Sequence, residues 1–304
     1  MHLMNQNRTI LIASIYLFFT TLFWAGNFIV GKTASLNEIP PISLNFYRWL
    51  IAWFILLPFT YKELIEKKEY IIKNIGIFII LGITAVSIFN SALFYSLKFT
   101  QVITGVLMIS VVPVMIILFS VLLKIEKTNI FQIFGVALSL TGVVLIITKA
   151  DIEILKNLDF NRGDLTMLIA MFSWSIYSAL LKKKKYELSQ ITLLQVVIGF
   201  GVIILIPFYF IDINIGNEIK FDIPFFLILT YVVLFPGLIS FFLWIKGVGL
   251  IGANRAGIYL HLMPILGAIM AMIIFGEKIL FYHFVGAIFI IAGIVLSNKK
   301  KLNA

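Results

Sequence analysis

The sequence contains no cysteine, and only 12% of its 304 residues are charged. Without cysteine the chain can form no disulfide, no thiolate nucleophile and no cysteine-ligated metal site. Ordinary soluble domains carry about 25% charged residues. A chain with half that share and 61% hydrophobic residues has too little polar surface to cover a water-soluble fold. The composition therefore excludes soluble, disordered, collagen-like and disulfide-stapled proteins, and predicts a protein embedded in a lipid bilayer.

Acidic residues are also few, and all 14 lie in loops or at the ends of apolar stretches. An intramembrane relay of carboxylates, common in proton pumps, is therefore not expected. The three histidines, His2, His261 and His283, follow no metal-binding or catalytic spacing. We expect no metal, no cofactor and no enzymatic activity. A membrane-embedded lipid-modifying enzyme is the alternative from another class, but it would have no acid–base pair; a non-transporting scaffold is a third interpretation.

Long apolar stretches dominate the rest of the sequence. A helix needs about 20 apolar residues to cross a bilayer, and lipid offers no hydrogen-bond partner to backbone outside a helix or closed barrel. Ten stretches qualify, the second interrupted by Arg48: residues 9–31, 42–59, 74–97, 99–123, 128–148, 165–181, 188–211, 223–245, 256–276 and 279–298. We expect an all-α polytopic membrane protein with ten transmembrane helices.

The formal charge of +10 is interpreted as an orientation signal rather than as a nucleic-acid surface. If the N-terminus is cytoplasmic, the inner loops hold 16 lysines and arginines and the outer loops 7. Basic residues accumulate in cytoplasmic loops, where they face anionic lipid headgroups. The sequence thus predicts a multi-pass protein of the plasma (bacterial inner) membrane with both termini in the cytoplasm. Its partners are the bilayer and a small-molecule substrate, and no nucleic acid is expected.

Two halves of the sequence resemble each other. Shifting the chain by 150 residues aligns Trp24 with Trp174. A shift of 151 aligns Pro113 with Pro264, Glu126 with Glu277, Gly135 with Gly286 and Gly142 with Gly293. We expect two repeats, residues 1–150 and 160–304. Because each holds five spans, the second enters the membrane from the opposite side. This predicts two inverted five-helix repeats, which in transporters place a substrate site near the membrane midplane.

Arg48 is the charged residue that lies within an expected span. Charged side chains at such depth are costly and usually face the protein interior or a water-filled cavity. Arg48 is therefore a candidate for recognising an anionic group such as a carboxylate. The alternative is a structural arginine that reaches the membrane interface or caps carbonyl groups.

Further candidate substrate-binding residues are polar and aromatic side chains that recur at helical spacing within the expected spans. They are Trp24, Asn27, Asn90, Ser91, Tyr95, Trp174, Tyr177, Ser240, Trp244, Tyr259 and His261. One interpretation is a cavity with aromatic walls and a few polar anchors. The other is that these groups form hydrogen bonds between helices, each worth roughly 0.6 kcal/mol.

Prolines and glycines mark further positions in both halves. Pro113 and Pro264 are expected in the middle of the fourth and ninth spans, where each would kink its helix and act as a hinge or as a packing feature. The paired glycines are spaced seven apart, so they share a helix face and predict close helix packing.

Two phosphate-binding patterns occur and are rejected. Residues 26–33 satisfy the P-loop pattern and residues 247–252 satisfy G-x-G-x-x-G. Both patterns need a strand before the glycine loop, whereas these lie in apolar, helix-like surroundings. We interpret residues 247–252 as a tight turn between two spans.

The residues now described resemble the EamA family of the drug/metabolite transporter superfamily. The matching segments are residues 23–28, 46–49, 252–257 and 276–277, together with Pro113, Glu126 and Pro264. The first repeat departs from the family's usual Leu-Gly-Glu in having Lys124-Ile125-Glu126. The resemblance implies ten helices, two EamA domains, cytoplasmic termini and a central cavity.

The expected function is a secondary transporter that moves a small, amino-acid-like metabolite across the plasma membrane by alternating access. A transporter of S-adenosylmethionine or another nucleotide-like solute is the alternative, since aromatic walls also suit stacking. Substrate identity, direction, coupling ion and oligomeric state, monomer or homodimer, are left open.

Overall fold

The computed structural model describes residues 2–100, 105, 108–148, 151, 153–156, 161–183, 186–275 and 280–298. Every regular element in these ranges is helical, so the all-α expectation is confirmed. In chain order they are α1 (His2–Leu36), α2 (Pro41–Glu66), α3 (Lys68–Lys73), α4 (Ile75–Gly82), the π-helical η1 (Ile83–Ile88), α5 (Phe89–Phe99), α7 (Val112–Leu122), α8 (Ile130–Ile147), α9 (Glu153–Lys156), α10 (Arg162–Leu180), α11 (Gln190–Asn214), α12 (Ile223–Val233), the π-helical η2 (Leu234–Ile239), α13 (Ser240–Ile251), α14 (Ala253–Gly257), the 3-10 helix η3 (Ile258–His261), α15 (Leu262–Phe275) and α16 (Phe281–Ser297).

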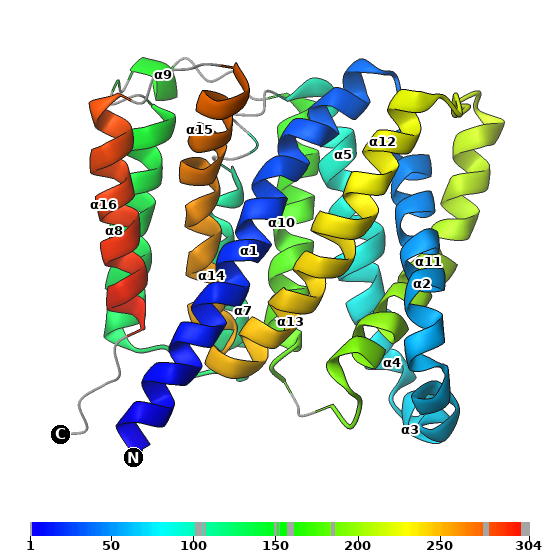
Figure 1. Ribbon diagram of the computed structural model, residues 1–304, viewed down its shortest axis with the longest axis horizontal. Coiled ribbons are helices and arrows are strands. Elements are labelled where there is room, and N and C mark those ends of the chain that lie inside the picture. The colour runs from blue at the N-terminus through cyan, green and yellow to red at the C-terminus, as the bar shows by residue number, and fades with distance from the viewer. Residues whose placement is uncertain are drawn as a thin grey trace.

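Five helical stretches in the described ranges are long and apolar enough to cross a bilayer. They are Arg8–Leu36, Pro41–Glu66, Ile75–Phe99, Gln190–Asn214 and Ile223–Ile251. Shorter apolar helices occupy Val112–Leu122, Ile130–Ile146 and Phe281–Ser297. The helices form one bundle in which the start of α1 and the end of α16 lie at the same end and α9 lies at the other (Figure 1). The structure is thus that of a multi-pass helical membrane protein, and the full number of ten spans stays a prediction.

Several helices begin where a polar side chain caps the first turn. Asn129 and Gln132 exchange backbone and side-chain hydrogen bonds of 2.9 Å at the start of α8. Asn161 and Asp164 form the same arrangement at the start of α10. These bonds satisfy N–H groups that have no partner within the helix. The caps explain why α8 and α10 begin where the polar loop sequence ends.

The order of elements in the first half recurs in the second. The series α4–η1–α5 corresponds to α12–η2–α13, and both π-helical segments span six residues. Leu234 begins the second π segment 151 positions after Ile83 begins the first. A π-helical turn is rare and leaves carbonyl groups free for other partners. Its occurrence at matching positions therefore gives both halves a polar break in the middle of a long apolar helix.

The helices α2 and α11 lie side by side in opposite directions and are joined at both ends by a hydroxyl–carboxylate bond. At one end Ser43 Oγ donates to Asp212 Oδ2 at 2.8 Å. At the other end Thr192 Oγ1 donates to Glu63 Oε2 at 2.6 Å. Each bond joins the start of one helix to the end of the other, so the two contacts are reciprocal.

The expected close packing of the paired glycines is confirmed between α8 and α16. A methyl group added to Gly142 would lie 2.5 Å from the Gly286 carbonyl oxygen, and one added to Gly293 would lie 2.5 Å from that of Gly135. Only hydrogen fits at these positions, which lets the two backbones touch. This contact is also reciprocal between the halves.

The two prolines lie at points where the helical geometry of the chain changes. Pro113 is in the first turn of α7, after a turn at Ser110 and Val111 that follows the helical residues 108–109. Pro264 is in the first turn of α15, directly after η3. Proline lacks an N–H and is best accommodated where the helix needs none. Both prolines therefore lie next to a change of helical geometry, and their action as hinges stays a prediction.

The glycine-rich segment 247–252 is also placed differently from the expected turn. Gly247 and Gly249 lie inside α13, and only Gly252 lies between α13 and α14. Gly252 has a φ of 88°, a backbone conformation that favours glycine. Of the three glycines in this segment, only Gly252 is required by the conformation of the turn. Gly247 instead packs closely against Leu17 on α1. Glu277 and much of the segment 149–163 lie outside the described residues.

Candidate functional site

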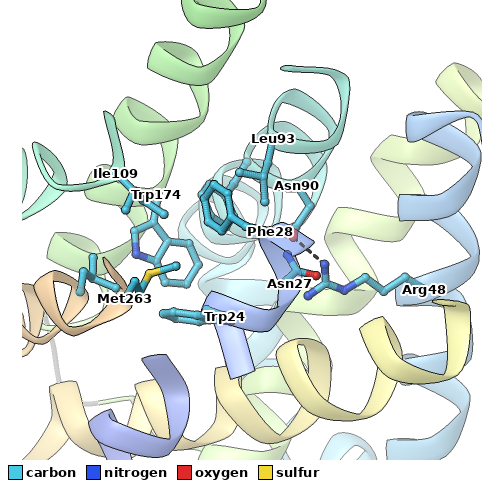
Figure 2. A pocket seen from close by; sticks show the side chains of 11 residues that line it. Trp24, Asn27, Phe28, Arg48, Asn90, Leu93, Ile109, Trp174 and Met263 are labelled. Carbon is cyan, nitrogen blue, oxygen red and sulfur yellow. Dashed lines mark hydrogen bonds between the residues drawn. The ribbon is translucent and has the colours of Figure 1, made fainter. Parts of the chain in front are cut away.

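The centre of the bundle contains a polar cluster contributed by three helices. Arg48 comes from α2, Asn27 from α1 and Asn90 from α5, and each is at most 4% exposed. Arg48 Nη1 donates to Asn90 Oδ1 at 2.8 Å, and Figure 2 shows Asn27 beside the same guanidinium. Asn90 Nδ2 donates to the carbonyl of Ala85 at 2.8 Å, within the π-helical segment. The irregular backbone thereby orients the amide that holds Arg48.

Arg48 points into the bundle and is only 1% exposed, so its side chain does not reach the surface of the bundle. Its guanidinium carbon lies 4.7 Å from the ring centre of Trp49 and 5.7 Å from that of Phe94. The two ion pairs formed by described residues are both exposed, and neither includes Arg48. A buried charge without an opposite charge costs several kcal/mol. The site therefore has an uncompensated positive charge that favours an anionic ligand.

Aromatic side chains pack beside this polar cluster. The ring centres of Trp24 and Trp174 are 5.0 Å apart, and those of Trp24 and Trp244 are 5.4 Å apart. Trp174 also contacts Tyr177 at 5.0 Å and Phe241 at 5.2 Å. These rings come from α1, α10 and α13, so both halves contribute. Together the five side chains, which we call the aromatic layer, form a wall next to Arg48.

The polar cluster lines one central cavity together with Trp24 and Trp174 of the aromatic layer (Figure 2). Its lining residues are Trp24, Asn27, Phe28, Arg48, Phe89, Asn90, Leu93, Ile109, Trp174, Leu260 and Met263. The free volume is only about 10 Å³, which is roughly enough for a single water molecule. The structure therefore represents a closed conformation in which the side chains themselves fill the centre.

Several polar atoms around the cavity have no hydrogen-bond partner although they are buried. They are Asn27 Oδ1, Arg48 Nε, Trp49 Nε1, Tyr177 OH and Trp244 Nε1. Leaving such an atom unsatisfied costs about 1–3 kcal/mol, and native proteins contain few of them. Most of these atoms are donors, so a ligand rich in acceptor atoms, such as a carboxylate, would suit them.

Three predicted residues take part in local or inter-helix contacts outside the cavity lining. Ser91 Oγ accepts from Asn45 Nδ2 at 2.9 Å, and Ser240 Oγ donates to the Phe235 carbonyl at 2.9 Å. Tyr95 is 38% exposed and packs on Phe99. The contact of Ser91 joins α5 to α2, as the alternative of bonding between helices expects, whereas those of Ser240 and Tyr95 lie within one helical stretch.

Tyr259 and His261 are also placed away from the cavity, although Leu260 between them lines it. The hydroxyl of Tyr259 lies 2.5 Å from Ser14 Oγ. His261 Nδ1 lies 2.5 Å from Ser139 Oγ, and its Nε2 lies 2.8 Å from the Ser110 carbonyl oxygen. Since a carbonyl can only accept, Nε2 carries the proton, and both ring nitrogens are occupied within the protein.

Residues that the sequence analysis missed are mainly apolar. Phe28, Phe89, Leu93, Ile109, Leu260 and Met263 line the cavity. The spacing of Phe89 and Leu93 beside Asn90 would have placed them on the same helix face, but apolar residues in a membrane helix carry no distinguishing signal. Trp49 was detectable as the neighbour of Arg48.

Comparison with known proteins gives a consistent result across the chain. The model of the EamA-like transporter family matches residues 11–148 and 161–299. An uncharacterized transporter of Archaeoglobus fulgidus is 28% identical over 98% of this chain and 99% of its own. The uncharacterized transporter YyaM of Bacillus subtilis is 26% identical over 91% of this chain and 90% of its own. A solved crystal structure aligns with 94% of this chain and 96% of its own, with a TM-score of 0.71 at 17% identity, which concerns the fold alone.

Proposed function

Because the chain belongs to the EamA-like transporter family, we propose that it is a secondary transporter that carries a small metabolite across the plasma membrane by alternating access. The family and the transporter names of its relatives indicate a membrane transporter rather than an enzyme. The observation that carries the proposal is Arg48, buried beside a central cavity with no carboxylate partner among the described residues.

The proposed architecture is ten transmembrane helices arranged as two inverted five-helix repeats. Support comes from the reciprocal contacts of α2 with α11 and of α8 with α16. In a two-fold arrangement, every contact between the halves occurs twice. If residue i of the first half contacts residue j of the second, the counterparts of i and j in the other halves also contact each other. The antiparallel direction of the matching helices α2 and α11 agrees with an axis in the membrane plane.

The proposed orientation places both termini in the cytoplasm. The start of α1 and the end of α16 lie at one end of the bundle, and the short α9 lies at the opposite end (Figure 1). The lysines between α2 and α4 and those after α10 belong to loops that we assign to the cytoplasmic end. Positive charge on that side follows the usual bias of membrane proteins.

The proposed substrate is an amino-acid-like solute with a carboxylate. Arg48 and Asn27 would bind the carboxylate, and the rings of Trp24 and Trp174 would contact the apolar part. Since the cavity holds only about 10 Å³, binding requires the halves to separate. A charge-assisted hydrogen bond to a buried arginine is stronger than a neutral one, which favours an anionic group over an amine at this site.

The test is solute flux into liposomes that contain the purified protein. A panel of labelled amino acids, nucleosides and S-adenosylmethionine is offered, and empty liposomes serve as the control. Saturable uptake of a carboxylate-bearing amino acid is the expected result. Uptake of the nucleotide-like solutes alone would favour the alternative substrate class, and no protein-dependent flux of any solute would contradict the proposal.

A further inference from the structure

A second cavity of about 560 Å³ opens between the ends of α10, α11 and α13. It is lined by Leu181, Lys182, Tyr186, Leu188, Gln190, Leu193, Ile245, Gly249 and Leu250. The ends of α10 and α13 that line it lie at the end of the bundle where α1 begins (Figure 1). We call this space the vestibule, and it is large enough to admit a small metabolite.

The aromatic layer connects residues that line the vestibule with residues that line the central cavity. On α10, Leu181 of the vestibule is one turn beyond Tyr177, and on α13, Ile245 directly follows Trp244. Both Tyr177 and Trp244 contact Trp174, at 5.0 and 5.5 Å. Trp174 in turn lines the central cavity. Tyr177 and Trp244 are therefore the aromatic residues next to both cavities.

The polar atoms of this layer are unlike those of a permanently closed core. Tyr177 OH and Trp244 Nε1 are buried and have no hydrogen-bond partner, and the same holds for Oγ of Ser178, the neighbour of Tyr177 in the sequence. Such atoms destabilise a core that never meets water. They gain partners if the layer opens and water or a polar solute passes, which gives a physical reason for polar aromatics at this position.

The rim of the vestibule carries a positive charge. Lys182 Nζ donates to the Gly249 carbonyl at 2.9 Å and so joins the end of α10 to the end of α13. Lys183, the next residue, is exposed. The walls between the rim and the aromatic layer are leucine and isoleucine side chains. This combination suits an organic anion with an apolar part, the same chemistry as the Arg48 site.

We propose that the vestibule is the binding site through which an organic anion enters from the cytoplasmic end, and that Tyr177 and Trp244 are its gate to the central cavity. This inference rests on the proposed function, since it assigns a route to the same substrate. An anionic lipid seated in the vestibule is the competing occupant, and the experiment distinguishes the two.

The natural absence of cysteine allows the route to be tested by chemical labelling. Leu93 lines the central cavity and is 1% exposed, so Leu93→Cys reports access to it. A negatively charged, membrane-impermeant methanethiosulfonate is applied to inside-out vesicles. Labelling is expected to be slow in the single variant and about tenfold faster when Tyr177→Ala or Trp244→Ala is added, since destabilising the closed state raises the open population.

Matched variants separate the gate from general loosening of the fold. Phe225→Ala removes an aromatic ring that is equally buried at 1% but lies on α12, and it should leave the labelling rate unchanged. Lys182→Gln should slow the anionic reagent relative to its cationic counterpart. Labelling that Tyr177→Ala and Trp244→Ala do not accelerate, or that Phe225→Ala accelerates equally, would overturn the proposal.

A cysteine in the vestibule itself tests the competing occupant. Leu193→Cys should be labelled readily in the absence of any gate mutation. If phosphatidylglycerol protects this cysteine while the gate variants leave Leu93→Cys unlabelled, the vestibule is a lipid site and the proposal is wrong. The labelling experiment measures access to the central cavity and does not depend on transport. If the gate variants change labelling as expected but the protein carries no solute into liposomes, the proposed function is contradicted and the gate is not.

Discussion

Replacing Arg48 by methionine tests the central site most directly. The guanidinium makes one hydrogen bond, to Asn90 at 2.8 Å, and a cation–π contact with Trp49 at 4.7 Å. The hydrogen bond is worth about 1.5–3 kcal/mol because it involves a charged group, and a desolvated cation–π contact contributes about 2 kcal/mol. Against these, removing an unpaired buried charge relieves a desolvation cost of several kcal/mol. The terms are of similar size and opposite sign, so the thermal stability of Arg48→Met should change little.

Transport should respond very differently. Losing one charged partner of a buried, hydrogen-bonded carboxylate costs about 2–5 kcal/mol, which corresponds to a fall of roughly 30- to 4,000-fold in kcat/KM at 1.4 kcal/mol per factor of ten. The fall should be large for a substrate with a free carboxylate and small for its neutral amide, because only the first presents a charge to Arg48. The assay is initial uptake of both compounds by proteoliposomes, with the melting temperature measured on the same preparation.

The matched control is Arg162→Met. Arg162 is an exposed arginine that lies over the ring of Phe99 at 3.9 Å, and its loss should alter neither uptake nor the preference for the carboxylate. The reasoning is refuted if Arg48→Met keeps the wild-type preference for carboxylate over amide. It is equally refuted if uptake of both compounds falls together with the melting temperature, because Arg48 would then be a structural residue.

Three further predictions concern topology, packing and energy coupling. In intact cells an impermeant thiol reagent should label Glu153→Cys on α9 and leave Lys183→Cys after α10 unlabelled; the reverse pattern would invert the proposed orientation. Gly293→Ala should lower the melting temperature, because its new methyl group would lie 2.5 Å from the carbonyl oxygen of the facing glycine on α8. Gly76→Ala on α4, where the methyl group meets nothing within 4 Å, should raise stability by up to about 1 kcal/mol. A pH gradient imposed with the membrane potential clamped should drive no uphill uptake, and His261→Gln should not alter this, since both ring nitrogens are bonded within the protein. Uphill accumulation that disappears in His261→Gln would identify this residue as a proton carrier instead.

Helical structure and membrane insertion were predictable because they depend on local properties. A run of about 20 apolar residues must satisfy its backbone within itself in lipid, whatever its neighbours are. The paired glycines were predictable for a related reason, since seven-residue spacing places two residues on one helix face before any partner is known. The proline positions were not, because a hydropathy pattern does not show where one helix ends and the next begins. Such a pattern does not show the turn before Pro113 or the 3-10 segment before Pro264.

The sequence by itself determined that this chain is an all-helical membrane protein, that its two halves are related, and that Trp24, Asn27, Arg48, Asn90 and Trp174 are candidates for one site. The tertiary structure decided which of the candidates meet. It brought Arg48 to Asn90 and Trp24 to Trp174, and it turned Tyr95, Tyr259 and His261 towards other partners. Helical spacing defines a face of one helix, but the direction that this face points is set by packing against the other helices. That packing is a property of the whole chain, and it also decided that the central cavity is closed while a larger one opens at the end of α10.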